Sequence, residues 1–143
     1  MAVVYFDSSA LVKLMVDEVG SDVAATLWNA CDAAFSSRLA YPEVRAVLAA
    51  AGRNHDLAES DALAAADDWE QFWSSMRPVE LTPDVERNAG SLAVTHHLGG
   101  ADAVHLASAL ALGTVDLTVA AWDRRLRAGA TSVGFAVAPA TLE

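Results

Sequence analysis

The sequence predicts an α/β fold built on a mainly parallel sheet of about five strands. Short apolar runs alternate along the chain with longer segments of helical periodicity. The first run, residues 2–6, is apolar throughout, which is typical of a strand buried on both faces of a parallel sheet. Parallel strands need crossover connections, so helices should cover both faces of this sheet.

The first half of the chain predicts two strands and three helices. The strand at residues 3–6 is followed by a helix through residue 15, for which Ser8 or Ser9 can provide the cap. After a loop, a helix capped by Ser21 or Asp22 carries Val23, Leu27 and Trp28, and residues 33–36 form a second strand. A long helix opens at Ser37 and ends at residues 52–56; Pro42 either delays its start or kinks it.

The second half repeats the alternation of helices and strands. Apolar residues between 62 and 76 recur at helical spacing and include Trp69 and Trp73, which fit core packing better than a partner-binding face. A strand at residues 78–81 precedes a helix with Pro83 in its first position, and glycines end that helix at residues 98–100. The helix at residues 101–112, the strand at 115–121, a short helix through Leu126 and a strand at 133–137 complete the pattern.

Composition limits the class of protein. The chain has 143 residues, enough for one domain over residues 1–143. Its only cysteine, Cys31, excludes an internal disulfide and a cysteine-based zinc site, and no targeting segment or membrane span is evident, so we expect a soluble cytoplasmic protein without membrane contact. The net charge of −10 argues against a broad basic surface for nucleic acid. An acidic chain can still act on nucleic acid where its carboxylates hold metal ions.

Four acids occupy positions from which they could converge. Asp7 and Asp123 each follow a predicted strand, Asp102 lies in the first turn of a helix, and Glu43 interrupts an apolar helical face. Strands of a parallel sheet present their carboxyl ends at one edge, where ligands bind in open α/β folds. Clustered carboxylates repel one another, and a divalent cation such as Mg²⁺ or Mn²⁺ removes that penalty. Taken singly, however, Asp7, Asp102 and Asp123 also suit helix capping or helix starts.

Four segments are similar to the motifs of PIN-domain nucleases, and especially of VapC-type toxins. Residues 7–13 resemble the first motif and residues 37–44 the second, with Glu43 as its acid. Residues 101–107 resemble the third and residues 122–126 the fourth, with Asp102 and Asp123 as their acids. The motifs occur in family order across nearly the whole chain. One departure is Ala121, where the family often has a threonine two residues before its last acid.

The resemblance implies a PIN-like three-layer α/β/α sandwich. It also implies a divalent-metal-dependent endoribonuclease, using Mg²⁺ or Mn²⁺, that acts as the toxin of a type II toxin–antitoxin pair. The partners implied are an RNA substrate, a small VapB-type antitoxin and a second copy in a homodimer. The residues expected to hold the metal and perform catalysis are Asp7, Glu43, Asp102 and Asp123.

Other polar residues near these motifs could support the site. Ser9 lies beside Asp7, Arg38 could contact phosphate, and His105 follows Asp102 by one helical turn. Helix capping, a solvated surface and core packing are their respective alternative roles.

Two other functions fit parts of the pattern. A phosphatase of the haloacid-dehalogenase type also begins with a strand and an aspartate, but it needs a second acid where Ser9 stands. A non-catalytic binding module on the same fold would have no need to keep all four acids.

Overall fold

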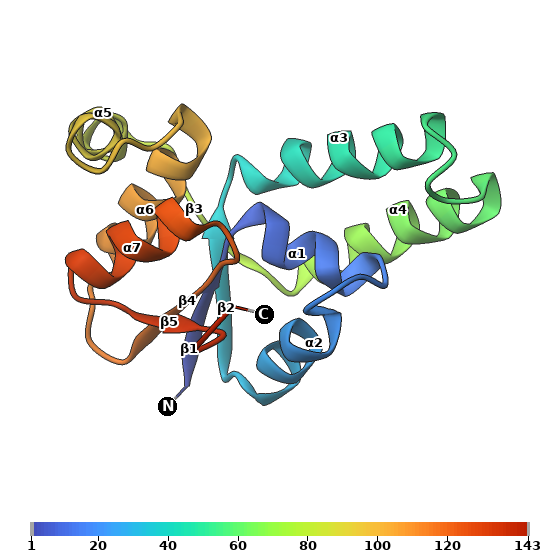
Figure 1. The fold of residues 1–143 in the computed structure, drawn as a ribbon, viewed down its shortest axis with the longest axis horizontal. Helices are drawn as coiled ribbons and strands as arrows, with labels where there is room; N and C mark the ends of the chain where they lie inside the picture. Colours follow the sequence, from blue (N-terminus) through green and yellow to red (C-terminus); the bar gives the residue numbers. More distant parts are fainter. Residues whose placement is uncertain (1, 143) are drawn as a thin grey trace.

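The computed structural model describes residues 2–142, which form a parallel sheet between two layers of helices (Figure 1). The sheet has five strands in the order β3-β2-β1-β4-β5, and every neighbouring pair is parallel. The predicted fold class is therefore confirmed. The strands are β1 (Val3–Phe6), β2 (Ala33–Ser37), β3 (Arg77–Val79), β4 (Leu117–Ala120) and β5 (Ala136–Ala138).

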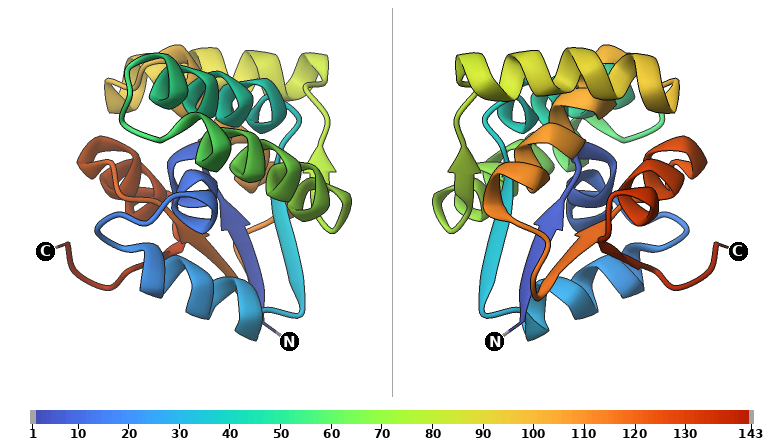
Figure 2. Two further views of the ribbon diagram at one scale, coloured as in Figure 1. Left: turned by 90° about the vertical axis from the view of Figure 1, so that its right-hand side faces the viewer. Right: turned by 90° about the vertical axis from the view of Figure 1, so that its left-hand side faces the viewer.

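Seven helices cover the two faces of the sheet within the described residues, and two separate hydrophobic clusters define the layers. One cluster lies beneath α1 to α4 and the other beneath α5 to α7. The side views of Figure 2 show the helices grouped on opposite sides of the strands. The helices are α1 (Ser8–Met15), α2 (Ser21–Ala30), α3 (Ala40–Arg53), α4 (Glu59–Ser74), α5 (Pro83–His96), α6 (Gly100–Leu112) and α7 (Arg124–Ser132). None of them is both long and apolar enough to cross a membrane.

The central strand β1 explains why the first apolar run is continuous. Val4 and Phe6 pack into the cluster beneath α1 to α4, whereas Tyr5 packs into the cluster on the other face. Tyr5 and Phe6 are both completely buried. A strand with helices on both sides needs apolar surface on both, as the sequence predicts.

Two helix starts differ from the prediction. Ser37 ends β2 instead of opening a helix, and its hydroxyl accepts a hydrogen bond from the Leu39 N–H at 3.0 Å. The helix α3 starts at Ala40, so of the two effects expected of Pro42 the structure shows the delayed start, with Pro42 in the first turn. Proline is tolerated there because its missing N–H would have no partner inside the helix. At α2, Gly20 is the N-cap, not Ser21 or Asp22, and provides no side-chain hydrogen bond.

Other boundaries also shift. The helix α5 ends at His96, and His97 takes the left-handed conformation (φ 56°) that we expected of a glycine, while Gly99 caps α6. The edge strands β3 and β5 are shorter than predicted, and β5 begins three residues later. Trp69 is fully buried, which confirms its predicted core role, whereas Trp73 is only partly buried.

Candidate active site

The four predicted acids lie where the parallel strands end and helices begin. Asp7 follows β1 and caps α1, and Asp123 follows β4 and caps α7. These two strands are paired neighbours, and the Asp7 N–H donates to the Ala120 carbonyl at 3.2 Å. Asp102 lies in the first turn of α6 and Glu43 in the first turn of α3. The topology thus brings acids from four distant motifs to one edge of the sheet.

Asp7 is a buried carboxylate with local partners. Its Oδ1 accepts the Ala10 N–H at 2.8 Å, and the Ser9 hydroxyl contacts Oδ1 at 2.8 Å and Oδ2 at 3.0 Å. Asp7 is therefore the N-cap of α1, which confirms one of the two roles expected of it and excludes Ser8 and Ser9 as the cap. Burial raises the pKa of Asp7, and the charge of Asp102 raises it further, against the opposing effects of His105, Ala10 and Ser9.

Asp102 links the other acids electrostatically. It is half-buried, and burial is the main reason why its pKa is raised. The negative charges of Asp123 and Glu43 raise that pKa further, while His105 lowers it. Asp102 therefore interacts with the three other acids, because it also raises the pKa of Asp7. Asp123 is exposed, and its Oδ1 accepts the Leu126 N–H at 2.9 Å.

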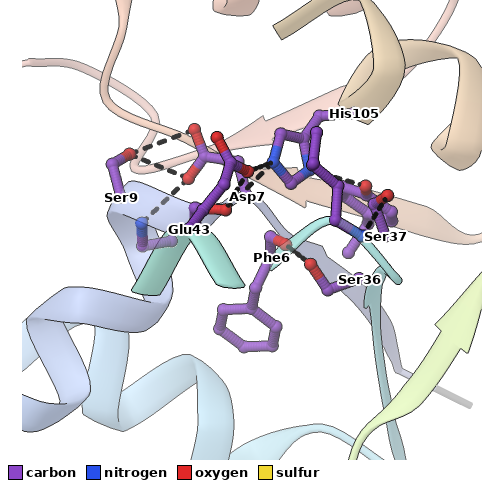
Figure 3. A network of polar contacts seen from close by, with 11 residues as sticks. Phe6, Asp7, Ser9, Ser36, Ser37, Glu43 and His105 are labelled. Carbon is purple, nitrogen blue, oxygen red and sulfur yellow. Dashed lines mark hydrogen bonds and ion pairs between the residues drawn. The ribbon is translucent and has the colours of Figure 1, made fainter. Parts of the chain in front are cut away.

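Glu43 belongs to a polar network that reaches into the core (Figure 3). Its Oε1 accepts the Ser8 hydroxyl at 2.6 Å and lies 2.8 Å from His105 Nε2, and His105 Nδ1 lies 2.8 Å from the Tyr5 hydroxyl. Partial burial alone would raise the pKa of Glu43, but the hydrogen bonds from His105 and Ser8 outweigh it, so the pKa is lowered. The surroundings of Glu43 thus favour its ionised form, whereas those of Asp7 and Asp102 disfavour theirs.

The donor set fits a hard divalent cation. All four candidate ligands are carboxylates, and Mg²⁺ and Mn²⁺ prefer oxygen donors. The pKa values of Asp7 and Asp102 are raised partly by neighbouring negative charge, which a bound cation would offset. As the side chains stand, no three His, Cys, Asp or Glu residues within 2–142 are grouped closely enough to hold a metal ion.

Of the three predicted supporting residues, the structure places two at the site and one away from it. Ser9 and His105 join the site, through Asp7 and Glu43 respectively. Arg38 instead forms an exposed ion pair with Glu80 and is not part of the network around Glu43.

Three residues that sequence reasoning did not select also support the site. Tyr5 and Ser8 belong to the network around Glu43. Arg127 Nη1 donates to the Ala121 carbonyl at 2.9 Å, and its Nη2 donates to the Pro139 carbonyl at 2.6 Å. Arg127 therefore fixes the backbone two residues before Asp123. Two features of the sequence could have indicated Tyr5 and Arg127. One is the hydroxyl of Tyr5 on an otherwise apolar strand, and the other is an arginine within the apolar face of α7.

Comparison with known proteins agrees with this architecture. The sequence matches the PIN domain family over residues 4–130. The chain belongs to the PIN-domain family. It is 64% identical to Ribonuclease VapC45 of Mycobacterium tuberculosis (strain CDC 1551 / Oshkosh) over 143 residues, covering 100% of this chain and 99% of that protein.

Solved structures share the PIN fold at lower sequence identity. The crystal structure of M. tuberculosis VapC20, described as a sarcin–ricin loop cleaving toxin, matches 92% of this chain and 95% of its own, with 21% identity and a TM-score of 0.67. A toxin–antitoxin complex from Klebsiella pneumoniae matches 100% and 97%, with 17% identity and a TM-score of 0.61. Membership of the PIN family excludes the alternative of a haloacid-dehalogenase phosphatase.

Proposed function

We propose that this chain is a VapC-type endoribonuclease, one PIN domain spanning residues 1–143, that hydrolyses RNA phosphodiester bonds with a divalent cation. The observation that carries the proposal is the placement of four acids at helix starts along one edge of the sheet: Asp7 and Asp123 cap the helices that follow paired strands, and Glu43 and Asp102 lie in the first turns of α3 and α6. The identity of 64% to a protein named as a ribonuclease supports the same activity.

Asp7, Glu43, Asp102 and Asp123 would hold Mg²⁺ or Mn²⁺. When bound, such an ion stabilises negative charge on the phosphoryl oxygens and makes water a better nucleophile. The chain's own residues orient the ligands. Ser9 and the first turn of α1 fix Asp7, Ser8 and His105 fix Glu43, and the first turn of α7 fixes Asp123. Because these contacts hold the carboxylates in fixed positions, a bound ion would meet its ligands already oriented, which lowers the entropic part of the barrier.

The partner that fits this function is a small VapB-type antitoxin, as in a toxin–antitoxin pair. The structural neighbour from K. pneumoniae is itself a toxin–antitoxin complex. Because the candidate site gathers negative charge, we propose that the inhibitory segment carries an arginine or lysine that enters it. A charge-reversal scan of a co-purified partner tests this: inhibition that survives replacement of every basic residue would contradict it. A homodimer is also expected, and sedimentation of the purified chain would measure it.

Mapping of RNA ends tests the endonucleolytic activity. Total RNA treated with the wild-type protein and Mg²⁺ should acquire discrete new 5′ ends inside transcripts. The same RNA treated with Asp102→Asn should not, whereas Asp67→Asn, an exposed acid on α4, should behave as wild type. Progressive shortening from RNA termini, or equal cleavage by Asp102→Asn, would contradict the proposal.

A further inference from the structure

A chain of hydrogen bonds connects the buried sheet to the candidate site. Tyr5 comes from β1, His105 from α6 and Glu43 from α3, and both links, from the Tyr5 hydroxyl to His105 Nδ1 and from His105 Nε2 to Glu43 Oε1, measure 2.8 Å. Tyr5 is completely buried and His105 is 2% exposed, while Glu43 reaches the surface. The chain therefore runs from the rigid core to a proposed metal ligand.

The direction of each hydrogen bond follows from what the end groups can donate. Tyr5 is completely buried, and a tyrosine is a phenol with a proton to donate at neutral pH, because its ordinary pKa is about 10. The Glu43 carboxylate has only acceptor atoms. The Tyr5 proton thus points to His105 Nδ1, and the imidazole proton lies on Nε2, where it is donated to Glu43. A hydrogen bond to one ring nitrogen fixes the histidine tautomer in this way.

Both donors to Glu43 converge on the same oxygen. Ser8 Oγ lies 2.6 Å and His105 Nε2 lies 2.8 Å from Oε1. Among residues 2–142, no donor contacts Oε2. The network thus satisfies one oxygen of the carboxylate and leaves the other available.

We propose that Tyr5 and His105 are positioning residues, which hold Glu43 Oε1 through the Nε2–H tautomer of His105 so that Oε2 is presented to the bound cation. The tautomer and the hydrogen bonds stand on the geometry alone, whereas the purpose of the arrangement rests on the proposed metal-dependent function. Outer partners of this kind commonly orient metal ligands, and their loss typically weakens metal affinity about 10- to 100-fold.

The competing explanation is simple packing. The rings of Tyr5 and His105 meet edge to face, with centroids 5.8 Å apart. A packing role needs the shapes of the two side chains but not their hydrogen bonds. The decisive variants are therefore those that keep shape and remove or restore a donor.

Nitrogen NMR of the metal-free protein tests the tautomer directly. In uniformly ¹⁵N-labelled protein at neutral pH, His105 should show a protonated Nε2 and an unprotonated Nδ1. Tyr5→Phe removes only the hydroxyl and should shift Nδ1. A proton on Nδ1, protons on both nitrogens, or a spectrum unchanged by Tyr5→Phe would overturn the proposal, whatever the enzymatic activity.

Calorimetric titration with Mn²⁺ tests whether the hydrogen-bonded chain helps Glu43 to bind the cation. We expect His105→Leu to weaken binding about 10-fold or more and Tyr5→Phe, one link further away, about 3-fold. His105→Gln can donate from a similar position and should bind more tightly than His105→Leu. The control is Thr82→Ala, which removes the hydrogen-bonding cap of α5 and touches neither ring.

The outcomes separate the two proposals. Equal losses for the Gln and Leu variants, or a loss in Thr82→Ala as large as in Tyr5→Phe, would overturn the positioning role while leaving the proposed function intact. Wild-type protein that binds no Mn²⁺ would overturn the metal-dependent function, and with it the purpose assigned to the hydrogen-bonded chain.

Discussion

Asp7 and Asp123 have the same local role on neighbouring parallel strands. Asp7 Oδ1 accepts the Ala10 N–H at 2.8 Å and Asp123 Oδ1 accepts the Leu126 N–H at 2.9 Å, so each carboxylate caps the helix that follows its strand. Capping and metal binding are therefore compatible, because the cap uses one oxygen of each side chain. The charge and the cap can be separated by choice of substitution.

Asparagine and alanine at position 7 should have different effects. Asparagine caps helices about as well as aspartate, so Asp7→Asn should keep stability within a few tenths of a kcal/mol or raise it, because it also removes a repelling charge. Asp7→Ala loses the cap and should cost about 1 kcal/mol. Both variants should lose RNA cleavage. Chemical denaturation measures the free energy of unfolding of each variant. A large loss of stability in Asp7→Asn would contradict the expected destabilisation of the folded protein by the charge of Asp7.

Divalent cations should stabilise the folded protein. A cation that binds only the native site at 100 times its Kd adds about 2.7 kcal/mol, or roughly 5–10 °C in Tm for a chain of this size. Thermal denaturation with Mg²⁺ or Mn²⁺ measures the shift. The Tm of Asp102→Asn should rise little on adding the cation, whereas that of Asp67→Asn should rise as much as that of the wild type. An equal shift in both variants would show that the cation binds elsewhere.

The metal-free protein should become more stable as the pH falls from neutral toward about 4. The pKa values of Asp7 and Asp102 are raised in the folded state, so the native protein binds more protons than the unfolded chain in this range. Their contribution is complete below the unfolded pKa and is lost as the pH rises through the folded pKa. Glu43, whose pKa is lowered, opposes this only near and below its unfolded pKa. Urea denaturation between pH 4 and 7 should show a flatter profile for the Asp7→Asn, Asp102→Asn double variant; identical profiles would contradict the account.

RNA affinity should depend only weakly on salt. At a net charge of −10, contact with RNA must be local, through the bound metal and a few arginines. The slope of log affinity against log salt at saturating metal should therefore correspond to about one to three phosphates. The measurement is fluorescence anisotropy of wild-type protein with a non-cleavable RNA. The Asp102→Asn variant does not suit this test, because it should bind little metal. A slope of six or more phosphates would indicate a broad basic surface.

The sequence predicts those parts of the site that depend on local pattern. Asp7 and Asp123 are found because an apolar run ends at each, and Asp102 because helix starts favour acids. The sequence leaves the cap of α1 open among Asp7, Ser8 and Ser9, because all three residue types suit an N-cap, and the structure shows that Asp7 takes it. The late start of α3 depends on the turn at Ser37, which Pro42 alone does not specify.

The sequence places His105 near the site but does not show that it pairs with Glu43 and Tyr5. His105 and Glu43 are 62 residues apart, and Tyr5 and His105 are 100 apart, so only the folded arrangement of β1, α3 and α6 brings them together. Tyr5 fits its strand as an apolar residue, and nothing local shows that its hydroxyl will meet a histidine. Arg127 similarly acquires its role from the backbone carbonyls that surround it after folding.

The central claim is that four carboxylates at the sheet edge form one metal-dependent RNA-cleaving site. Its most direct test is cleavage of a defined RNA by the purified protein, first with Mg²⁺ or Mn²⁺ and then with excess EDTA, for wild type, Asp102→Asn and Asp67→Asn. We predict cleavage by wild type and Asp67→Asn that stops with EDTA and returns with added metal, and none by Asp102→Asn. Full cleavage in metal-free buffer, or undiminished cleavage by Asp102→Asn, would contradict this account.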